Sequence, residues 1–213
     1  MDIRLSDTRV VLPGTSTQLF RIRQFEVAAG SKVLVHGRSG VGKTTLLHLI
    51  AGLFLPTSGI VRVGEAELTK MTESDRGALR RKYYGMLFQK LNLIDHLTGW
   101  ENVRIGVFAE TDADKRTSKA LHKLGMDGFA HQLSGNLSMG EQQRLAVARV
   151  VAANPTIALI DEPTSSLDQE NADVVMEALF SLPAETTLIM VSHDQRIRPR
   201  FSQVYAFEQL VTR

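Results

Sequence analysis

The chain has 213 residues, a length that fits one large domain with a properly buried hydrophobic core. Its formal net charge of +2 is too small to indicate nucleic-acid binding by itself, and the absence of cysteine excludes disulfides and metal–thiolate sites. The charged start of the chain predicts no signal peptide. The longest uncharged run, residues 44–61, approaches transmembrane length but contains Pro56 and Gly59, so we expect a soluble chain.

Strand signals dominate the first part of the chain. Residues 2–27 alternate between apolar and polar side chains, which predicts paired strands around a turn at Pro13 and Gly14. Residues 32–36 predict a short strand, and residues 59–64 predict a further one. We therefore expect the N-terminal part to be rich in β-structure.

A phosphate-binding motif, G-x-x-x-x-G-K-T, lies between the strand 32–36 and a predicted helix over residues 44–51. Glycines let backbone N–H groups turn around a phosphate, and the helix N-terminus adds its positive end. Lys43 is expected to reach the β- and γ-phosphates, and the Thr44 hydroxyl to bind Mg²⁺. This strand–loop–helix context disfavours an unoccupied glycine-rich turn. The predicted phosphate site comprises Gly37, Arg38, Ser39, Gly40, Val41, Gly42, Lys43, Thr44 and Thr45.

Helix signals dominate the middle of the chain, where few strand signals occur between residues 90 and 153. Capping patterns begin a basic helix at Thr72 and another at Thr98, the latter paired with Glu101 and running toward Phe108. A polar helix is predicted over residues 112–124, ended by Gly125. Further along, we expect a helix over residues 171–182, a strand over 186–191 and a last strand near 203–207.

A second chemical site is predicted where an apolar run, residues 156–160, ends in Asp161 and Glu162. Such a run suits a buried parallel strand, and its terminal carboxylates would face the crevice outside the strand ends. Asp161 can hold Mg²⁺ through water, and Glu162 can polarise an attacking water. The alternative, two solvated acids at a strand end, is less favoured beside a phosphate loop.

Five motifs in order make the chain similar to the ATP-binding subunit of an ABC transporter, over nearly its whole length. Residues 137–144 resemble the family signature, LSGGQ, and residues 161–168 resemble the Walker B strand running into the D-loop. Gln89 occupies the place of the Q-loop glutamine, and His193 that of the switch histidine. Either residue alone would be taken for an ordinary polar side chain.

The resemblance implies an α/β fold: a P-loop NTPase core with an N-terminal antiparallel β subdomain and an inserted α-helical subdomain. The whole chain, residues 1–213, would be one ABC ATPase domain. The core would comprise about residues 1–89 and 154–213, and the helical subdomain about residues 90–153.

The resemblance also implies a homodimer in which two chains, head to tail, sandwich two ATP molecules. Ser138 and Gly140 would contact the γ-phosphate bound by the partner copy, and the helix over about residues 140–153 would point its N-terminus at it. Asp168 would cross the dimer interface. A single copy would therefore hold only half of each ATP site.

The remaining roles follow from the same resemblance. Glu162 would be the catalytic base of ATP hydrolysis, and His193 would contact the γ-phosphate. Gln89 would reach Mg²⁺ or the attacking water and report to the membrane partner. Thr44 and Asp161 complete the predicted Mg²⁺ site.

Two positions depart from the family pattern. Met139 replaces the first signature glycine, which removes backbone freedom and adds bulk beside the partner's phosphate. The family often stacks adenine on an aromatic ring, but the corresponding position, near Val10, has none, and Phe20 reads as a core strand residue. Because such stacking is worth roughly 1–3 kcal/mol for nucleic-acid bases, nucleotide affinity is expected to be weak or adenine selectivity relaxed.

Residues 89–103 are similar to the segment FQxxNLxxxLTxxENV of the bacterial lipoprotein-release, macrolide-export and cell-division group. This likeness implies an ATPase at the inner face of the bacterial cytoplasmic membrane, with integral membrane permease subunits as partners and no nucleic acid. It would power export or mechanotransmission across the cell envelope. Four apolar residues either line a groove for a coupling helix or pack the helical subdomain: Leu91, Leu93, Ile94 and Leu97.

Other functions remain open to different degrees. A regulatory ATPase of the cell-division type, which signals through a membrane partner without transport, is not separated by the sequence from the leading hypothesis. Non-transport ABC proteins of translation or DNA repair usually carry tandem domains or a long coiled-coil insertion, and this chain has neither. A small-molecule kinase is disfavoured by the signature and by His193.

Overall fold

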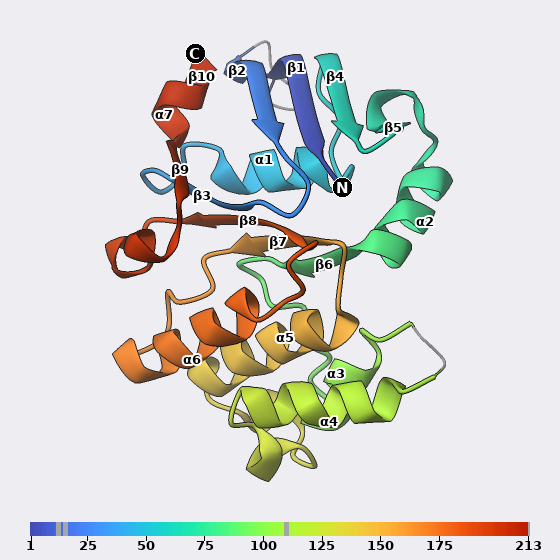
Figure 1. Ribbon diagram of the computed structural model, residues 1–213, viewed down its shortest axis with the longest axis vertical. Helices are drawn as coiled ribbons and strands as arrows, with labels where there is room; N and C mark the ends of the chain where they lie inside the picture. The colour runs from blue at the N-terminus through green and yellow to red at the C-terminus, as the bar shows by residue number, and fades with distance from the viewer. Residues whose placement is uncertain (12–13, 15–16, 109–110, 213) are drawn as a thin grey trace. The chain divides into compact units, whose positions relative to one another are not determined.

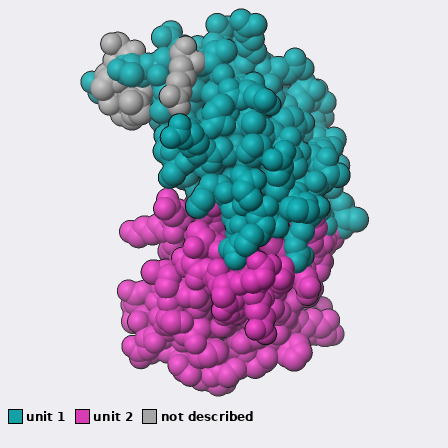
Figure 2. All heavy atoms as spheres, turned by 90° about the vertical axis from the view of Figure 1, so that its left-hand side faces the viewer, with its two compact units in different colours: residues 1–84, 156–161, 184–213 teal, residues 85–155, 162–183 magenta. Residues whose placement is uncertain are grey.

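The computed structural model describes residues 1–11, 14, 17–108 and 111–212. The chain forms two compact units, coloured separately in Figure 2. Unit 1 comprises residues 1–84, 156–161 and 184–213, and unit 2 comprises residues 85–155 and 162–183. Unit 2 includes the segment predicted as a helical subdomain, residues 90–153, together with a later segment around the D-loop. The predicted core and subdomain boundaries remain a prediction.

Unit 1 contains an antiparallel sheet with strand order β10-β2-β1-β4-β5 (Figure 1). Its strands are β1 (Ile3–Val11), β2 (Gln18–Val27), β4 (Ser58–Val63), β5 (Ala66–Glu67) and β10 (Val211–Thr212). Side chains alternate between buried and exposed along β1 and β2, as expected for a sheet with one face on the core. The predicted N-terminal strand pair is thus confirmed. Pro13 of the predicted turn lies outside the described residues.

The second sheet of unit 1 is parallel, with strand order β7-β8-β3-β9. Its strands are β3 (Lys32–His36), β7 (Ile157–Asp161), β8 (Thr187–Ser192) and β9 (Gln203–Ala206). Every residue of β7 and β8 is buried, which explains why both read as continuous apolar runs. The predicted buried parallel strand before Asp161 is therefore confirmed.

The helices of unit 1 are α1 (Lys43–Ile50), α2 (Glu73–Tyr83) and α7 (Phe207–Leu210), with single 3₁₀ segments at Leu68–Lys70 and Gln195–Arg200. α2 begins where predicted, because the Thr72 side chain accepts a hydrogen bond from the backbone N–H of Asp75. α1 ends at Ile50 with Ala51 as its C-cap, and Gly52 then adopts a φ of 64°.

The end of the chain differs from the prediction. A short helix, α7, and a further strand, β10, follow β9, the strand predicted to be the last. β10 pairs with β2, with Val211 opposite Ile22. Two residues are too few to carry a periodic signal, so only pairing across the sheet reveals this strand.

The strand β6 (Tyr84–Leu87), which begins at the last residue of the first segment of unit 1, was likewise not predicted.

Unit 2 is mostly helical. Its helices are α3 (Gly99–Arg104), α4 (Ala113–Lys123), α5 (Met139–Ala153) and α6 (Gln169–Phe180), with 3₁₀ turns at Asp127–Phe129 and Ser134–Asn136. α5 packs against α3, α4 and α6 and buries mainly small and medium-sized apolar residues (Figure 1). In the described residues, no helix is both long enough and apolar enough to cross a membrane.

Helix boundaries in unit 2 follow local capping chemistry. α3 begins with the predicted capping box between Thr98 and Glu101, but it ends at Arg104 instead of continuing toward Phe108. Gly106 disfavours further helix, because glycine loses more backbone freedom than other residues on folding. α6 begins two residues earlier than predicted, because the Asp168 carboxylate caps it by accepting from the backbone N–H of Asn171.

Candidate nucleotide site

Three parallel strands of unit 1 end at one edge of the sheet. In the strand register Val191 lies opposite both Val35 and Asp161, and Ser192 lies opposite His36. The phosphate loop therefore starts beside the buried Asp161, and His193 follows directly after Ser192. Ligands of parallel sheets bind outside such carboxyl ends, so this edge is the candidate site.

The phosphate loop depends on glycine backbones. Gly40 has a φ of 76°, and Gly42, the N-cap of α1, has a φ of 116°. A Cβ atom on Gly42 would lie 2.8 Å from Cε1 of Phe20, which is closer than real Cβ contacts. The conformation and the packing therefore both require glycine at this position.

Lys43 is held against the loop that precedes it. Its Nζ donates to the carbonyl oxygens of Gly37, at 2.8 Å, and Arg38, at 2.9 Å. The side chain is buried although it carries a charge, and these carbonyls offset part of its desolvation. The ammonium group thus stays close to the loop that is predicted to cradle the phosphates.

Thr44 and Asp161 meet although 117 residues separate them in the chain. The Thr44 hydroxyl donates to Oδ2 of Asp161 at 2.6 Å, and Asp161 is 2 % exposed. A hydroxyl and a carboxylate are hard oxygen donors, which Mg²⁺ prefers when it also binds substrate phosphates and water. The described residues contain no cluster of three or more His, Cys, Asp or Glu that could hold a metal ion by itself.

His48 lies one helical turn after Thr44, and two opposing effects act on its pKa. Burial lowers the pKa of His48, and the negative charge of Asp161 raises it by a smaller amount. The net effect favours the neutral imidazole. His48 therefore contributes little positive charge beside the Asp161 carboxylate near neutral pH.

The C-terminal segment supports the start of the phosphate loop, which the sequence did not predict. Oε1 of Glu208 accepts from the backbone N–H of Arg38 at 3.1 Å. The backbone N–H of Glu208 itself, and then that of Arg38, hold the pKa of the Glu208 carboxyl below its usual value. Phe207 packs edge-to-face on Phe20, with ring centroids 5.4 Å apart. Phe20 is fully buried, as expected for a core strand residue.

Glu162 follows β7 directly and belongs to unit 2. Its φ of 48° lies in the left-handed region, which is uncommon for residues other than glycine. Its carbonyl oxygen accepts from the backbone N–H of Ser165, at 3.4 Å, and from the Ser165 hydroxyl, at 3.2 Å. The backbone at this position is therefore held in an unusual conformation, as often occurs at functional sites.

The signature segment begins α5. Ser138 is the N-cap and forms a capping box with Glu141, whose Oε2 accepts from the Ser138 hydroxyl and backbone N–H, each at 2.7 Å. The Ser138 hydroxyl holds the pKa of Glu141 below its usual value, and the Ser138 backbone N–H adds to the effect. Met139 is the first helical residue and is 61 % exposed, so within one chain its bulk faces solvent. Gly140 lies against the D-loop, because a Cβ there would come 3.4 Å from Leu167.

The predicted site residues divide between the two units. Unit 1 brings together the phosphate loop, Asp161 and the exposed His193 at the ends of β3, β7 and β8. Unit 2 contains Gln89, which is exposed two residues after the end of β6, together with Glu162, Asp168 and the signature residues. Asp168 caps α6, and its role at a dimer interface remains a prediction.

A family model described as ABC transporter matches residues 20–165. The chain belongs to the ABC transporter family. Curated ABC relatives include the lipoprotein-releasing system ATP-binding protein LolD of Psychrobacter arcticus, 39% identical over 85% of this chain and 84% of the relative. LolD of Hydrogenovibrio crunogenus is 36% identical over 89% of this chain and 85% of the relative. The chain is thus an ATP-binding protein and ATPase of the ABC family.

Solved ABC structures confirm the predicted fold class. The dimeric structure of MJ0796, a bacterial ABC transporter cassette, has a TM-score of 0.87 and 29% identity, and covers 95% of this chain and 92% of that one. A dimeric post-hydrolysis structure of MJ0796 bound to ADP and Pi has a TM-score of 0.88 and 28% identity, over 99% and 97% of the two chains. In both, the ABC cassette is dimeric.

Sequence reasoning missed a set of contacts that follow the ABC signature. Gln142 donates to the carbonyls of Ser134 and Leu137, each at 3.1 Å, which ties the helix start to the preceding loop. Gln143 donates to the carbonyl of Pro163, which follows Glu162. Arg144 donates to Asn171, which in turn donates to Asp168. The only signal was the polar run after the signature, and its partners lie in another part of the chain.

Proposed function

We propose that this ABC ATPase is the ATP-hydrolysing subunit of a membrane complex that powers export or mechanotransmission across the cell envelope. ATP binding would drive two copies to dimerise. The observation that carries the proposal is the strand edge where the phosphate loop, Thr44 and Asp161 meet, with a 2.6 Å hydrogen bond between the last two. A loop built for phosphate beside a hydroxyl–carboxylate pair is suited to Mg²⁺–ATP.

The phosphate loop would bind the triphosphate through its backbone N–H groups and through Lys43. Thr44 and Asp161 would hold Mg²⁺, whose charge neutralises the negative charge that develops on the phosphates during hydrolysis. Gln89 is a third proposed contact to the metal site. Because Lys43 is held by the carbonyls of Gly37 and Arg38, its ammonium group is preorganised at the loop.

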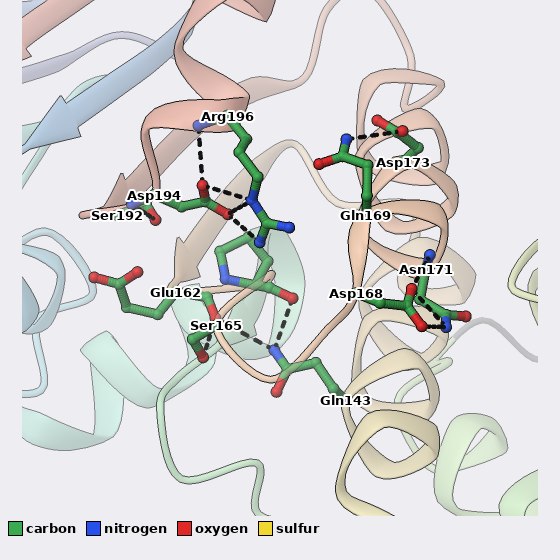
Figure 3. A network of polar contacts seen from close by, with 11 residues as sticks. Gln143, Glu162, Ser165, Asp168, Gln169, Asn171, Asp173, Ser192, Asp194 and Arg196 are labelled. Atoms are coloured by element: carbon green, nitrogen blue, oxygen red, sulfur yellow. Dashed lines mark hydrogen bonds and ion pairs between the residues drawn. The ribbon is translucent and has the colours of Figure 1, made fainter.

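Glu162 would act as the base. Its carboxylate would accept a proton from water as that water attacks the γ-phosphorus, and the β–γ bridging oxygen would leave with ADP. His193 would donate a hydrogen bond to the γ-phosphate. The orientation of Glu162 supports this role. In Figure 3 its side chain points away from Gln143, whereas its backbone carbonyl faces the Gln143 amide group.

A partner copy would complete each site through its signature. Ser138 and Gly140 lie at the N-terminus of α5, which carries a partial positive charge suited to a γ-phosphate. The dimeric structures of MJ0796 support the dimerisation that this arrangement requires. Asp168 would lie at the same interface, in addition to capping α6.

The proposed membrane partner and cellular site are supported by the names of the curated relatives. Relatives of similar length are named as ATP-binding proteins of lipoprotein-releasing systems, which favours work on the cell envelope. The chain would therefore sit at the inner face of the bacterial cytoplasmic membrane, bound to integral membrane permease subunits. The names of these relatives favour this function over a regulatory ATPase that transports nothing.

The decisive experiment measures ATP hydrolysis by the purified chain and by Glu162→Gln, with Mg²⁺ present. The variant should lose turnover and, because bound ATP then persists, form a dimer with ATP in size-exclusion chromatography. Glu170→Gln, which removes an exposed carboxylate from α6, is the control and should retain turnover. Unchanged turnover in Glu162→Gln would exclude Glu162 as the base. If this variant stayed monomeric at saturating ATP, that result would contradict the proposed dimer with ATP between its two copies.

A further inference from the structure

The backbone at Glu162 needs outside support. Its φ of 48° is unfavourable for a residue with a side chain, and Pro163 follows it. A proline restricts the preceding residue to extended backbone, so the helical regions are disfavoured at Glu162 for a second reason. Residues persist in such conformations only when surrounding contacts over-determine them. The identity of these contacts therefore bears on how the Glu162 carboxylate is aimed.

Gln143 supplies one of these contacts from the signature helix. Its Nε2 donates to the carbonyl of Pro163 at 3.1 Å and lies 3.5 Å from the carbonyl of Glu162 (Figure 3). The shorter bond is the stronger one, and the longer contact is at the limit of a hydrogen bond. Gln143 is 4 % exposed, so bulk water cannot easily take over the hydrogen bonds that its amide group donates. One side chain thus contacts the peptides on both sides of Pro163, the first of which is the Glu162–Pro163 peptide itself.

The other end of this link is the ABC signature. Gln143 lies on the second turn of α5, whose start is fixed by the capping box between Ser138 and Glu141. The neighbouring Gln142 donates to the carbonyl of Leu137, which ties the loop to the start of the helix. A displacement of the signature would be transmitted through α5 to the carbonyl of Pro163.

We propose that Gln143 is a positioning residue that couples the signature helix to the conformation of Glu162. The proposal rests on the proposed function, in which Glu162 is the base of one ATP site and the signature of the same chain contacts the other ATP. Gln143 would then connect the two ATP sites through a single chain. Its role would be to hold the backbone from which the Glu162 carboxylate projects, through the contacts to the carbonyls of Glu162 and Pro163.

The test uses Gln143→Met, which keeps side-chain length and removes both donors. Steady-state ATP hydrolysis with Mg²⁺ should show kcat reduced at least tenfold, while KM for ATP changes less than threefold. Gln143→Asn, which keeps the amide but reaches less far, should give an intermediate kcat. Thr117→Val is the matched control: it removes one buried hydrogen bond, from Thr117 to the carbonyl of Ala113, in the same unit. Its kcat should be that of the wild type.

A second measurement separates positioning from general damage to the signature. In the Glu162→Gln background, Gln143→Met should still form the dimer with ATP, because its effect passes through Glu162 and not through ATP binding. A wild-type kcat in both Gln143 variants would overturn the proposal. Loss of the ATP-dependent dimer in the double variant, or a KM that rises as much as kcat falls, would also overturn it. Turnover retained by Glu162→Gln alone would instead refute the proposed function.

Discussion

The hydroxyl of Thr44, at the start of α1, donates a 2.6 Å hydrogen bond to the buried carboxylate of Asp161, at the end of β7. Two motifs that lie far apart in the chain therefore share one polar contact. The contact sets the distance between the two oxygen donors that we propose for Mg²⁺. Substitution of Thr44 therefore tests the proposed Mg²⁺ site directly.

Thr44→Val should remove Mg²⁺-dependent ATP hydrolysis, because valine keeps the shape but has no hydroxyl. We expect kcat to fall roughly 100-fold, equivalent to about 2.7 kcal/mol in the barrier. Thr44→Ser retains the hydroxyl and should stay within a few-fold of the wild type. The measurement is hydrolysis as a function of Mg²⁺ concentration, and equal rates for the valine and serine variants would contradict the Mg²⁺ assignment.

Gly42→Ala should destabilise unit 1. A methyl group at this position would lie 2.8 Å from the ring of Phe20, and the φ of 116° is strained for alanine. We expect a loss of about 1–3 kcal/mol in the free energy of unfolding, measured by urea denaturation. Gly128→Ala is the control, because a Cβ there meets no heavy atom within 4 Å. Equal stability of the two variants would contradict the packing argument.

Met139→Gly should raise ATP hydrolysis if the methionine crowds the phosphate bound by the partner copy. The variant should also lose roughly 0.5–1 kcal/mol of stability, because glycine disfavours helix. Met139→Ala separates the two effects of the methionine. If side-chain bulk matters, both variants should hydrolyse ATP faster than the wild type; if backbone freedom matters, only the glycine variant should. Unchanged rates in both would remove Met139 as an obstacle.

Glu208→Gln should reduce stability at neutral pH more than in acid. The folded-state pKa of Glu208 is lowered, chiefly by its own backbone N–H and that of Arg38. The carboxylate therefore stabilises the fold above its unfolded-state pKa, near 4.5, and this contribution is lost as the pH falls through the lower folded-state value. Urea midpoints of wild type and variant should differ at pH 7 and converge in acid, below the lowered folded-state pKa of Glu208. Glu177→Gln on α6 is the charge-matched control, and a difference for Glu208→Gln that is the same at both pH values would exclude this contact.

Local features were well predicted from the sequence. β3 occupies the predicted residues, and the capping patterns at Thr72 and Thr98 correctly marked the starts of α2 and α3. These signals depend on residues three or four positions apart, so they need no knowledge of the fold. The predicted end of α3, toward Phe108, was wrong because Gly106 disfavours continuation of the helix beyond Arg104.

The sequence by itself determined the family, the order of its motifs and the residue types of the candidate site. Those features are written in contiguous segments, such as residues 37–44 and 137–144, where spacing alone carries the chemistry. Only the tertiary structure decided which distant groups meet: Thr44 with Asp161, Arg38 with Glu208, and Gln143 with Pro163. The physical reason is that hydrogen-bond partners of buried polar groups are selected by packing, which brings together residues that no local pattern connects.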